Sequence, residues 1–461
     1  MTFSIIQKSQ LEGVKRLDAE YYQPEYLDLS GQLRKMKSIL LKDYSVKINR
    51  GKQPIYSGNG NVLALKSVYI RDSFIDDLGD EFVDENYYNK NSKSQIKKFD
   101  VLLNSTGVGT LGRSSYYYLD KKAVADGHVT IIRTKKELDP IYLDVFLKTK
   151  YGQFQINRLY SGSSGQIEIY PDNIGLIEIF LPKIEFQGEI SSVCKDAHDL
   201  EDQLKKLYKQ AEDILLDELK IKDLDLSDEA GFTVNLSEVK EIGRCDAEYF
   251  QPKYKKLIGH IKKNCNGAAL GDLVSVKKGI EPGAEEYLAA IDDEGLENGK
   301  GGQFIRVSSL SKFGVNDNDQ KYLSEKLYQE LKDDFEPKKG EILLTKDASP
   351  GVAYVLKENI EGIISGGILR LKIKNQEIED EYLALCVNSV IGRMQAERDA
   401  GGSIIAHWKP EQIKNMAIPI LPKPIQQEIS GLIRQSHDAR KKAKELLEEA
   451  KRKVEELIEN K

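Results

Sequence analysis

A long helical pattern occurs twice in this chain. Residues 189–219 and 428–458 align without a gap, 239 positions apart. In both segments small or apolar residues recur at steps of three and four, which is typical of the heptad seam of a coiled coil. At about 1.5 Å per residue, each segment forms a helix on the order of 45 Å long. The matched seams predict that the two helices pair with each other, rather than lying on two unrelated cores.

The seam also predicts where the pair is tight. Leu446, Ala450 and Val454 are separated by two successive steps of four, a stutter that locally relaxes a supercoil. The helices are therefore expected to pair tightly over their first turns and to loosen toward Leu219 and Ile458. The predicted seam residues are Ile190, Val193, Ala197, Leu200, Leu204, Leu207, Ala211 and Ile214, and then Ile429, Leu432, Ser436, Ala439, Ala443, Leu446, Ala450, Val454 and Leu457.

A second duplicated motif precedes each helix. RLDAEYYQPEY at 16–26 returns as RCDAEYFQPKY at 244–254. Each copy leads into a short amphipathic helix and then into a region rich in β-forming residues, glycine and turn residues. The chain is thus predicted to be a tandem repeat of one α+β unit that ends in a long helix. Strands are expected near 44–48, 62–66, 100–103, 115–119, 128–133 and 176–180, and near 273–276, 304–307, 341–344, 353–356, 367–373 and 416–420, with helices at 25–37, 140–159, 253–263 and 379–397.

Composition excludes several classes of protein. At 461 residues the chain is too long for one hydrophobic core. Its formal net charge of −6 argues mildly against nucleic-acid binding without excluding it, because binding depends on where Lys and Arg cluster. The four cysteines form no CxxC pair, which argues against a zinc module or a disulfide framework. With no long apolar run and no signal peptide, a soluble, reduced, cytoplasmic protein is expected.

No catalytic constellation is found. Gly107-Val-Gly109-Thr-Leu-Gly112 is formally a GxGxxG motif after a strand, but a dinucleotide site needs a helix to follow. The next residues, RSSYYYLD, are typical of a strand, so a loop between two strands is predicted. His198 and His437 recur beside the seam; polar residues flanking the seam are favoured over a metal site. Neither a catalytic residue, nor a cofactor site, nor a metal site is expected in this chain.

Polar loops recur at matching places in the two halves and are candidates for contact with DNA. Their residue types reach phosphates and base edges, and neighbouring glycines let the backbone approach a phosphate. His407 and Trp408 could stack on a base, or Trp408 could anchor its loop, and both interpretations stay open. The candidate DNA-binding residues are Arg50, Lys52, Gln53, Ser105, Thr106, Arg113, Ser114, Ser163 and Ser164 in the first half, and Lys277, Lys278, Arg306, Thr345, Lys346, Ser403, His407, Trp408 and Lys409 in the second.

Over essentially its whole length the chain resembles the specificity subunit of Type I restriction–modification systems. The resemblance rests on the duplicated RxDAEYxQP motif, the connectors Leu181-Pro182-Lys183 and Leu421-Pro422-Lys423, the duplicated helices and the tandem order. It implies two target recognition domains separated by an antiparallel coiled-coil spacer, with a pseudo-twofold axis. The boundaries it suggests are 1–182 for the first recognition domain, 183–225 for the central spacer helix, 226–421 for the second recognition domain and 422–461 for the C-terminal spacer helix.

The resemblance also implies a function. The chain would bind a two-part, asymmetric double-stranded DNA site and direct adenine methylation or cleavage by its partners. Two modification subunits would use S-adenosylmethionine, and restriction subunits would use ATP and Mg. Two alternatives remain: the specificity subunit of another restriction class, whose partner fuses methyltransferase and nuclease, and a scaffold that binds protein instead of DNA. An enzyme that uses the 107–112 loop is disfavoured by the missing motifs.

Overall fold

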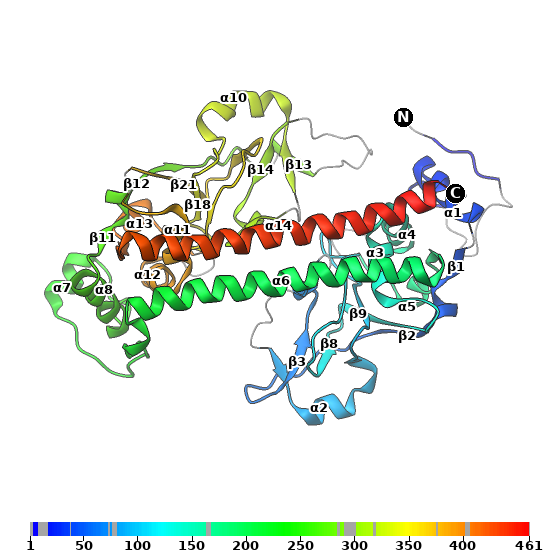
Figure 1. Cartoon of the computed structure of the whole chain (residues 1–461), viewed down its shortest axis with the longest axis horizontal. Helices are drawn as coiled ribbons and strands as arrows, with labels where there is room; N and C mark the ends of the chain where they lie inside the picture. The colour runs from blue at the N-terminus through cyan, green and yellow to red at the C-terminus, as the bar shows by residue number, and fades with distance from the viewer. Residues whose placement is uncertain are drawn as a thin grey trace. The chain divides into compact units, whose positions relative to one another are not determined.

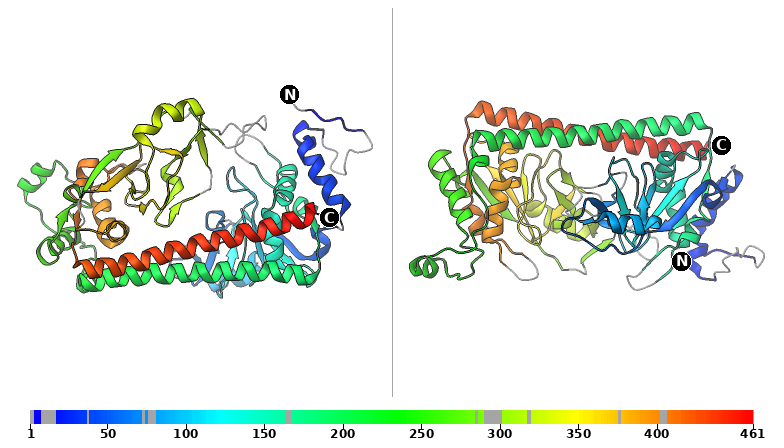
Figure 2. Two further views of the ribbon diagram at one scale, coloured as in Figure 1. Left: turned by 45° about the horizontal axis from the view of Figure 1, so that its top comes forward. Right: turned by 90° about the horizontal axis from the view of Figure 1, so that it is seen from below.

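The computed structural model (Figures 1 and 2) divides into two compact units. The first unit is Met1–Glu201 with Lys441–Lys461, and the second is Asp202–Arg440. Each unit therefore contains one α+β globule and part of each long helix. The structure describes residues 3–7, 17–36, 38–71, 74–75, 81–162, 167–283, 286–289, 301–316, 320–374, 377–401 and 406–460.

The first unit is built on a four-stranded antiparallel sheet with strand order β2-β9-β6-β7. Its strands are β2 (Ser45–Arg50), β9 (Val129–Thr134), β6 (Val101–Asn104) and β7 (Ser114–Tyr116). β6 is buried along its whole length because its alternating side chains enter two cores: Val101 and Leu103 join one, and Leu102 the other. A smaller mixed sheet has the order β4 (Phe82–Val83), β3 (Val62–Leu65), β8 (Ala123–Ala125) and β5 (Gln95–Ile96).

The second unit repeats the main sheet, whereas its smaller sheet has another strand order. Its main sheet has the order β12 (Val274–Lys278), β21 (Ile368–Ile373), β18 (Ile342–Thr345) and β19 (Ala353–Val355). The smaller sheet has the order β13 (Tyr287–Ala289), β17 (Lys321–Leu323), β14 (Gln303–Ile305) and β20 (Gly362–Ile364). Every strand predicted from the sequence overlaps an observed strand. The predicted strands at 176–180 and 416–420 correspond to β10 (Glu178–Phe180) and β22 (Ala417–Ile418).

The predicted helices at 140–159 and 379–397 are each two helices. They are α3 (Pro140–Lys148) with α4 (Lys150–Leu159), and α11 (Asp380–Asn388) with α12 (Val390–Asp399). Thr149 and Ser389 break the pattern, since each side-chain oxygen accepts a backbone N–H of the following helix. The short helices after the duplicated motif are confirmed as α1 (Pro24–Lys35) and α8 (Pro252–Asn264), each with proline in its first turn.

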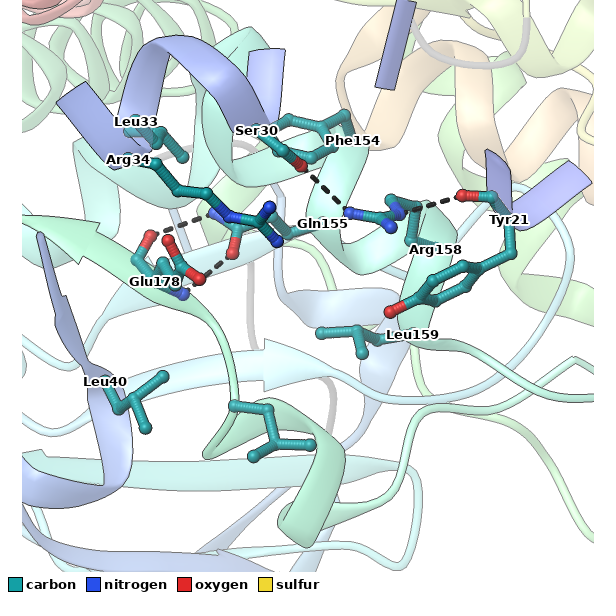
Figure 3. Close-up of a pocket in the computed structure, with 11 residues that line it drawn as sticks. Tyr21, Ser30, Leu33, Arg34, Leu40, Phe154, Gln155, Arg158, Leu159 and Glu178 are labelled. Atoms are coloured by element: carbon teal, nitrogen blue, oxygen red, sulfur yellow. Dashed lines mark hydrogen bonds between the residues drawn. The ribbon is translucent and has the colours of Figure 1, made fainter. Parts of the chain in front are cut away.

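The duplicated motif gives each unit a stacked arginine. Arg158 of α4 lies over the ring of Tyr21 at 4.0 Å, and Arg398 of α12 lies over Tyr249 at 5.4 Å. In the first unit a cavity of about 400 Å³ lies beside this contact, among α1, α4 and β10 (Figure 3). Arg158 donates to the Tyr21 carbonyl and to Ser30 Oγ, both at 2.9 Å. The motif therefore fastens the start of the unit to α4.

The long helices are α6 (Ile184–Glu218) and α14 (Lys423–Glu459), and they pair within each unit. In the first unit, Lys453 of α14 forms an ion pair with Glu189 of α6 at 2.8 Å. In the second, Ser436 Oγ of α14 donates to the Leu204 carbonyl of α6 at 3.0 Å. The start of α6 thus meets the end of α14, and the end of α6 meets the beginning of α14, so the predicted antiparallel pairing is confirmed.

Half of the predicted seam is shifted by one residue. Ile190, Ala197, Leu204 and Ala211 of α6 are buried, but the positions between them are Cys194, Tyr208 and Leu215 rather than Val193, Leu207 and Ile214. The shift has a physical cause: the buried stripe packs on the globule as well as on the partner helix, because these residues belong to the cores of the two units. On α14, Ile433 and Ile458 are likewise buried in place of Leu432 and Leu457.

This shift moves the predicted stutter to the last turns of α14. Read through Leu447, the positions Ala443, Leu447, Ala450 and Val454 step by four, three and four, and the two successive steps of four now join Ala450, Val454 and Ile458. Ala450, Val454 and Ile458 are almost fully buried in the first unit, and Leu219 is buried in the second. The prediction that the helices loosen toward these ends was wrong.

A buried glutamine attaches each long helix to its own globule. Gln187 of α6 accepts the Asp139 N–H at 2.8 Å and donates to the Pro182 carbonyl at 3.0 Å. Gln426 of α14 repeats this arrangement, accepting the Glu379 N–H at 2.9 Å and donating to the Leu421 carbonyl at 2.8 Å. Both glutamine side chains are almost fully buried, so each helix begins at a fixed point on the unit that precedes it.

Candidate nucleic-acid interface

Polar side chains gather at one end of the main sheet in each unit. At this end of the first unit β2 and β6 end while β7 and β9 begin, because neighbouring strands are antiparallel. We call the residues there the first tip: 50–53, 105–114, 127–128 and 168–170. The corresponding end in the second unit is the second tip: 277–279, 346–352, 366–367 and 406–409.

An arginine, a glutamate and a tyrosine form one side of the first tip. Arg50 pairs with Glu168 at 2.9 Å, donates to the Ile169 carbonyl at 3.1 Å and lies 5.6 Å from the Tyr170 ring. Hydrogen bonds from Tyr170 and Arg50 hold the pKa of Glu168 below its usual value. Tyr170 itself is 48% exposed. This group therefore offers an aromatic face and a guanidinium whose position is fixed.

A histidine also lies at the first tip, close enough to Glu168 to interact with it electrostatically. His128 is exposed, and its Nδ1 lies 2.7 Å from Thr106 Oγ1. Its backbone N–H donates to Asp126 Oδ1 at 2.8 Å; burial raises the pKa of this carboxyl group. Because Nδ1 is hydrogen-bonded to Thr106, Nε2 is the ring nitrogen that can bind a ligand.

The second tip holds a histidine in the same way but from another segment. His407 Nδ1 lies 2.9 Å from Asp347 Oδ1, and the His407 side chain is 62% exposed. Burial opposes ionisation of Asp347, but hydrogen bonds from Lys346 and His407 hold its pKa below the usual value. An isolated β-bridge joins the backbone of Asp347 to that of His407, and another joins Thr106 to Glu168 at the first tip. Equivalent positions thus orient an imidazole in both units.

The structure corrects several candidates. Ser105, Ser114, Thr345 and Trp408 are at most 1% exposed, so their side chains cannot reach DNA in this conformation. Ser105 bonds to the Leu103 carbonyl, Ser114 to Asp144, and Thr345 to the Ser349 carbonyl. Trp408 lies in the core of the second unit, so it anchors its loop. Ser163, Ser164 and Ser403 lie outside the described residues.

The remaining candidates differ in exposure. Lys346 is 9% exposed and bonds to Asp347, so its charge is already engaged. Sequence reasoning missed His128, Glu168, Tyr170 and Asp347; Asp347 and His128 stand inside segments that match between the halves, which was the available signal. Exposed candidates are Lys52, Gln53, Lys277, Lys278, His407 and Lys409, and half-buried candidates are Arg50, Thr106, Arg113 and Arg306.

Other motifs have structural explanations. The 107–112 motif is the predicted loop between strands β6 and β7, and no helix follows it. His198 is buried and stacks on Tyr116 at 4.7 Å, and the side chain of His437, which is 8% exposed, lies edge-on to Tyr354 at 5.4 Å, so each packs on its own globule. Over the described part of the chain, no cluster of His, Cys, Asp and Glu could hold a metal ion, and no helix has the length and apolar character of a membrane span.

The cavity in Figure 3 is not part of either tip. Its polar groups are bonded to one another: Gln155 donates to the Glu178 carbonyl and accepts the Glu178 N–H, at 2.9 and 2.7 Å. Gln395 makes the same two bonds with Ala417 in the second unit. These contacts are therefore structural elements of the repeated unit.

The family model "Type I restriction modification DNA specificity domain" matches the chain twice, at residues 32–212 and 267–451. The chain belongs to this family. It is the DNA sequence-recognition subunit of a Type I restriction–modification complex and is not the catalytic subunit. The family match favours this function over the two alternatives raised above. A search of curated proteins finds no match to the chain.

Several solved structures match the chain at low sequence identity and with low TM-scores. The S subunit of a Type I system from M. genitalium is 13% identical, with a TM-score of 0.40, and the match covers 92% of this chain and 94% of that one. The HsdS subunit from Thermoanaerobacter tengcongensis is 14% identical, with a TM-score of 0.28 and coverage of 92% and 95%. The type IIG restriction endonuclease BpuSI is 10% identical, with a TM-score of 0.31 and coverage of 46% and 35%.

Proposed function

We propose that each unit reads one half of a two-part DNA site with its sheet tip, and that the paired helices α6 and α14 set the distance between the halves. The observation that carries the proposal is the recurrence of one arrangement with different side chains. Both tips fix a histidine through Nδ1, but the first uses Thr106 and the second uses Asp347. Two similar readers with unlike side chains suit an asymmetric site.

The chemistry of the tips supports DNA contact despite the acidic net charge. The second tip carries Lys277, Lys278 and Lys409, all exposed, and the first carries Lys52. Such side chains position a protein on phosphates, whereas Gln53 and the two histidines have the donors and acceptors that read base edges. The exposed residues named here are therefore basic or neutral, although the chain as a whole has more acidic than basic residues.

The helices suit the role of a spacer. α6 has 35 residues and α14 has 37, and the first turn of each contains a buried glutamine that bonds to the adjacent globule. A helix of this length is on the order of 50 Å long, which exceeds the roughly 35 Å of one turn of B-DNA. In this proposal two modification subunits that use S-adenosylmethionine bind the chain, and restriction subunits that use ATP and Mg join them. The domain boundaries proposed are those of the sequence analysis.

Substitutions in the two tips test the proposal. The chain is co-purified with its modification partner, and methylated adenines are mapped by sequencing. His128→Ala should relax or weaken one half-site, and His407→Ala the other, by roughly 1–3 kcal/mol each if each ring contacts a base. Gln210→Ala, an exposed position on α6, serves as the control. If either histidine variant changes both half-sites equally, its unit does not read a single half-site.

A further inference from the structure

The loop between β6 and β7 presents an exposed valine at the first tip. Val108 is 66% exposed. It stands between Gly107 and Gly109, whose φ angles of 93° and 79° are disfavoured for residues with a Cβ. The backbone thus turns sharply on both sides of Val108, which places this side chain at the apex of the loop.

Hydrogen bonds hold the loop in one conformation. Gly107 N–H donates to the Ile167 carbonyl and Gly112 N–H to the Asn104 carbonyl, both at 3.0 Å. Thr110 Oγ1 donates to the Thr106 carbonyl at 2.8 Å. The loop therefore holds Val108 in a fixed position, two residues along the chain from Thr106, which orients His128.

The second unit lacks this feature. The connection between β18 and β19 spans residues 346–352, which is two residues shorter than the 105–113 connection in the first unit. Ala348 and Ser349 are its exposed residues. A single exposed valine needs no explanation by itself, but here the difference between the repeats falls in a rigid loop at the tip proposed to read bases.

We infer that Val108 reads the 5-methyl group of a thymine in the half-site bound by the first unit. Thymine is the base that presents a methyl group in the major groove, and apolar side chains make contact with it there. Valine offers two methyl groups on a short stem, while the neighbouring Thr106, His128 and Arg50 supply polar contacts. This inference rests on the proposed function and identifies one determinant of its specificity.

Deoxyuridine substitution tests the inference on the complex of the chain with its modification partner. After the motif is mapped, each thymine in the first half-site, other than the one opposite the methylated adenine, is replaced by deoxyuridine. Loss of one buried methyl contact should weaken binding about fourfold at one position. In the Val108→Ala complex the same replacement should have no effect. Val46→Ala, at a 67% exposed position near the start of β2, is the matched control and should keep the fourfold effect.

The outcomes separate the inference from the function on which it rests. If no thymine of the first half-site is sensitive to deoxyuridine, or if the sensitivity persists in Val108→Ala, Val108 does not read a methyl group. His128→Ala is measured in the same series. If His128→Ala still alters the first half-site, only the valine assignment fails; if it leaves that half-site unchanged, the proposed reading by the first tip fails as well.

Discussion

Replacing Gln187 by leucine should show how strongly a long helix is attached to its globule. The substitution removes the acceptor of the Asp139 N–H and the donor to the Pro182 carbonyl. A buried polar group left without a partner costs about 1–3 kcal/mol, so two such groups cost about 4 kcal/mol. Leucine offsets about 1 kcal/mol of this cost, because it buries more apolar surface than glutamine does. The expected loss in the free energy of unfolding is therefore about 3 kcal/mol.

Urea denaturation of the purified chain measures this loss, and hydrogen exchange at Asp139 N–H locates it. Gln426→Leu should have a similar cost in the second unit because it loses equivalent bonds. Gln210→Leu is the matched control, since Gln210 lies exposed on the same helix α6; surface changes of this kind usually stay within about 0.5 kcal/mol. If Gln187→Leu costs no more than Gln210→Leu, the glutamine does not attach the helix.

Two further predictions concern the second unit and the spacer. Burial, together with the nearby charges of Lys357 and Arg440, lowers the pKa of His437 to about 3. In the unfolded chain the pKa of this histidine is about 6.5. Between these two pH values the unfolded chain therefore binds a proton at His437 that the folded chain does not bind. The free energy of unfolding should fall as the pH drops below about 6.5, by about 2 kcal/mol between pH 7 and pH 5. In urea unfolding, the His437→Gln variant should lack this loss. If the variant has the same pH dependence as the original chain, His437 is not the cause of the loss. Inserting one heptad into both helices, after Glu201 and after Arg440, should lengthen the spacer by about 10 Å and widen the gap between half-sites by about three base pairs, as read by methylation mapping. A heptad inserted into α6 alone makes the two helices unequal and should abolish methylation by the complex. If the doubly extended chain supports full methylation with the original gap, the helices are not the spacer.

The repeat, the strands and the pairing of the two long helices could be predicted because each rests on a local period, whereas the antiparallel direction was implied by the resemblance to the family. The buried stripe of α6 was placed one residue away at alternate positions, because Cys194, Tyr208 and Leu215 face the globule as well as the partner helix. A heptad pattern alone does not contain that second packing surface. The breaks at Thr149 and Ser389 were missed because apolar residues continue on both sides of each cap.

The candidate site was harder to predict than the fold. Loop position predicted candidates that gather at one end of each main sheet, but it did not distinguish Lys409, which is exposed, from its neighbour Trp408, which fills the core. Serine and threonine at strand ends proved to satisfy backbone groups inside the unit, as Thr345 does for Val352 N–H at 3.0 Å. His128 and Asp347 contribute through tertiary contacts with residues distant in the sequence, 22 and 60 positions away, and no local pattern contains such contacts.

In the proposed function, one chain reads two unlike half-sites at a fixed separation. Mapping methylated adenines in DNA exposed to the chain and its modification partner measures this separation. We expect a two-part asymmetric motif whose gap has a constant length. A continuous motif, or two half-sites separated by a variable gap, would show that the chain does not work in this way.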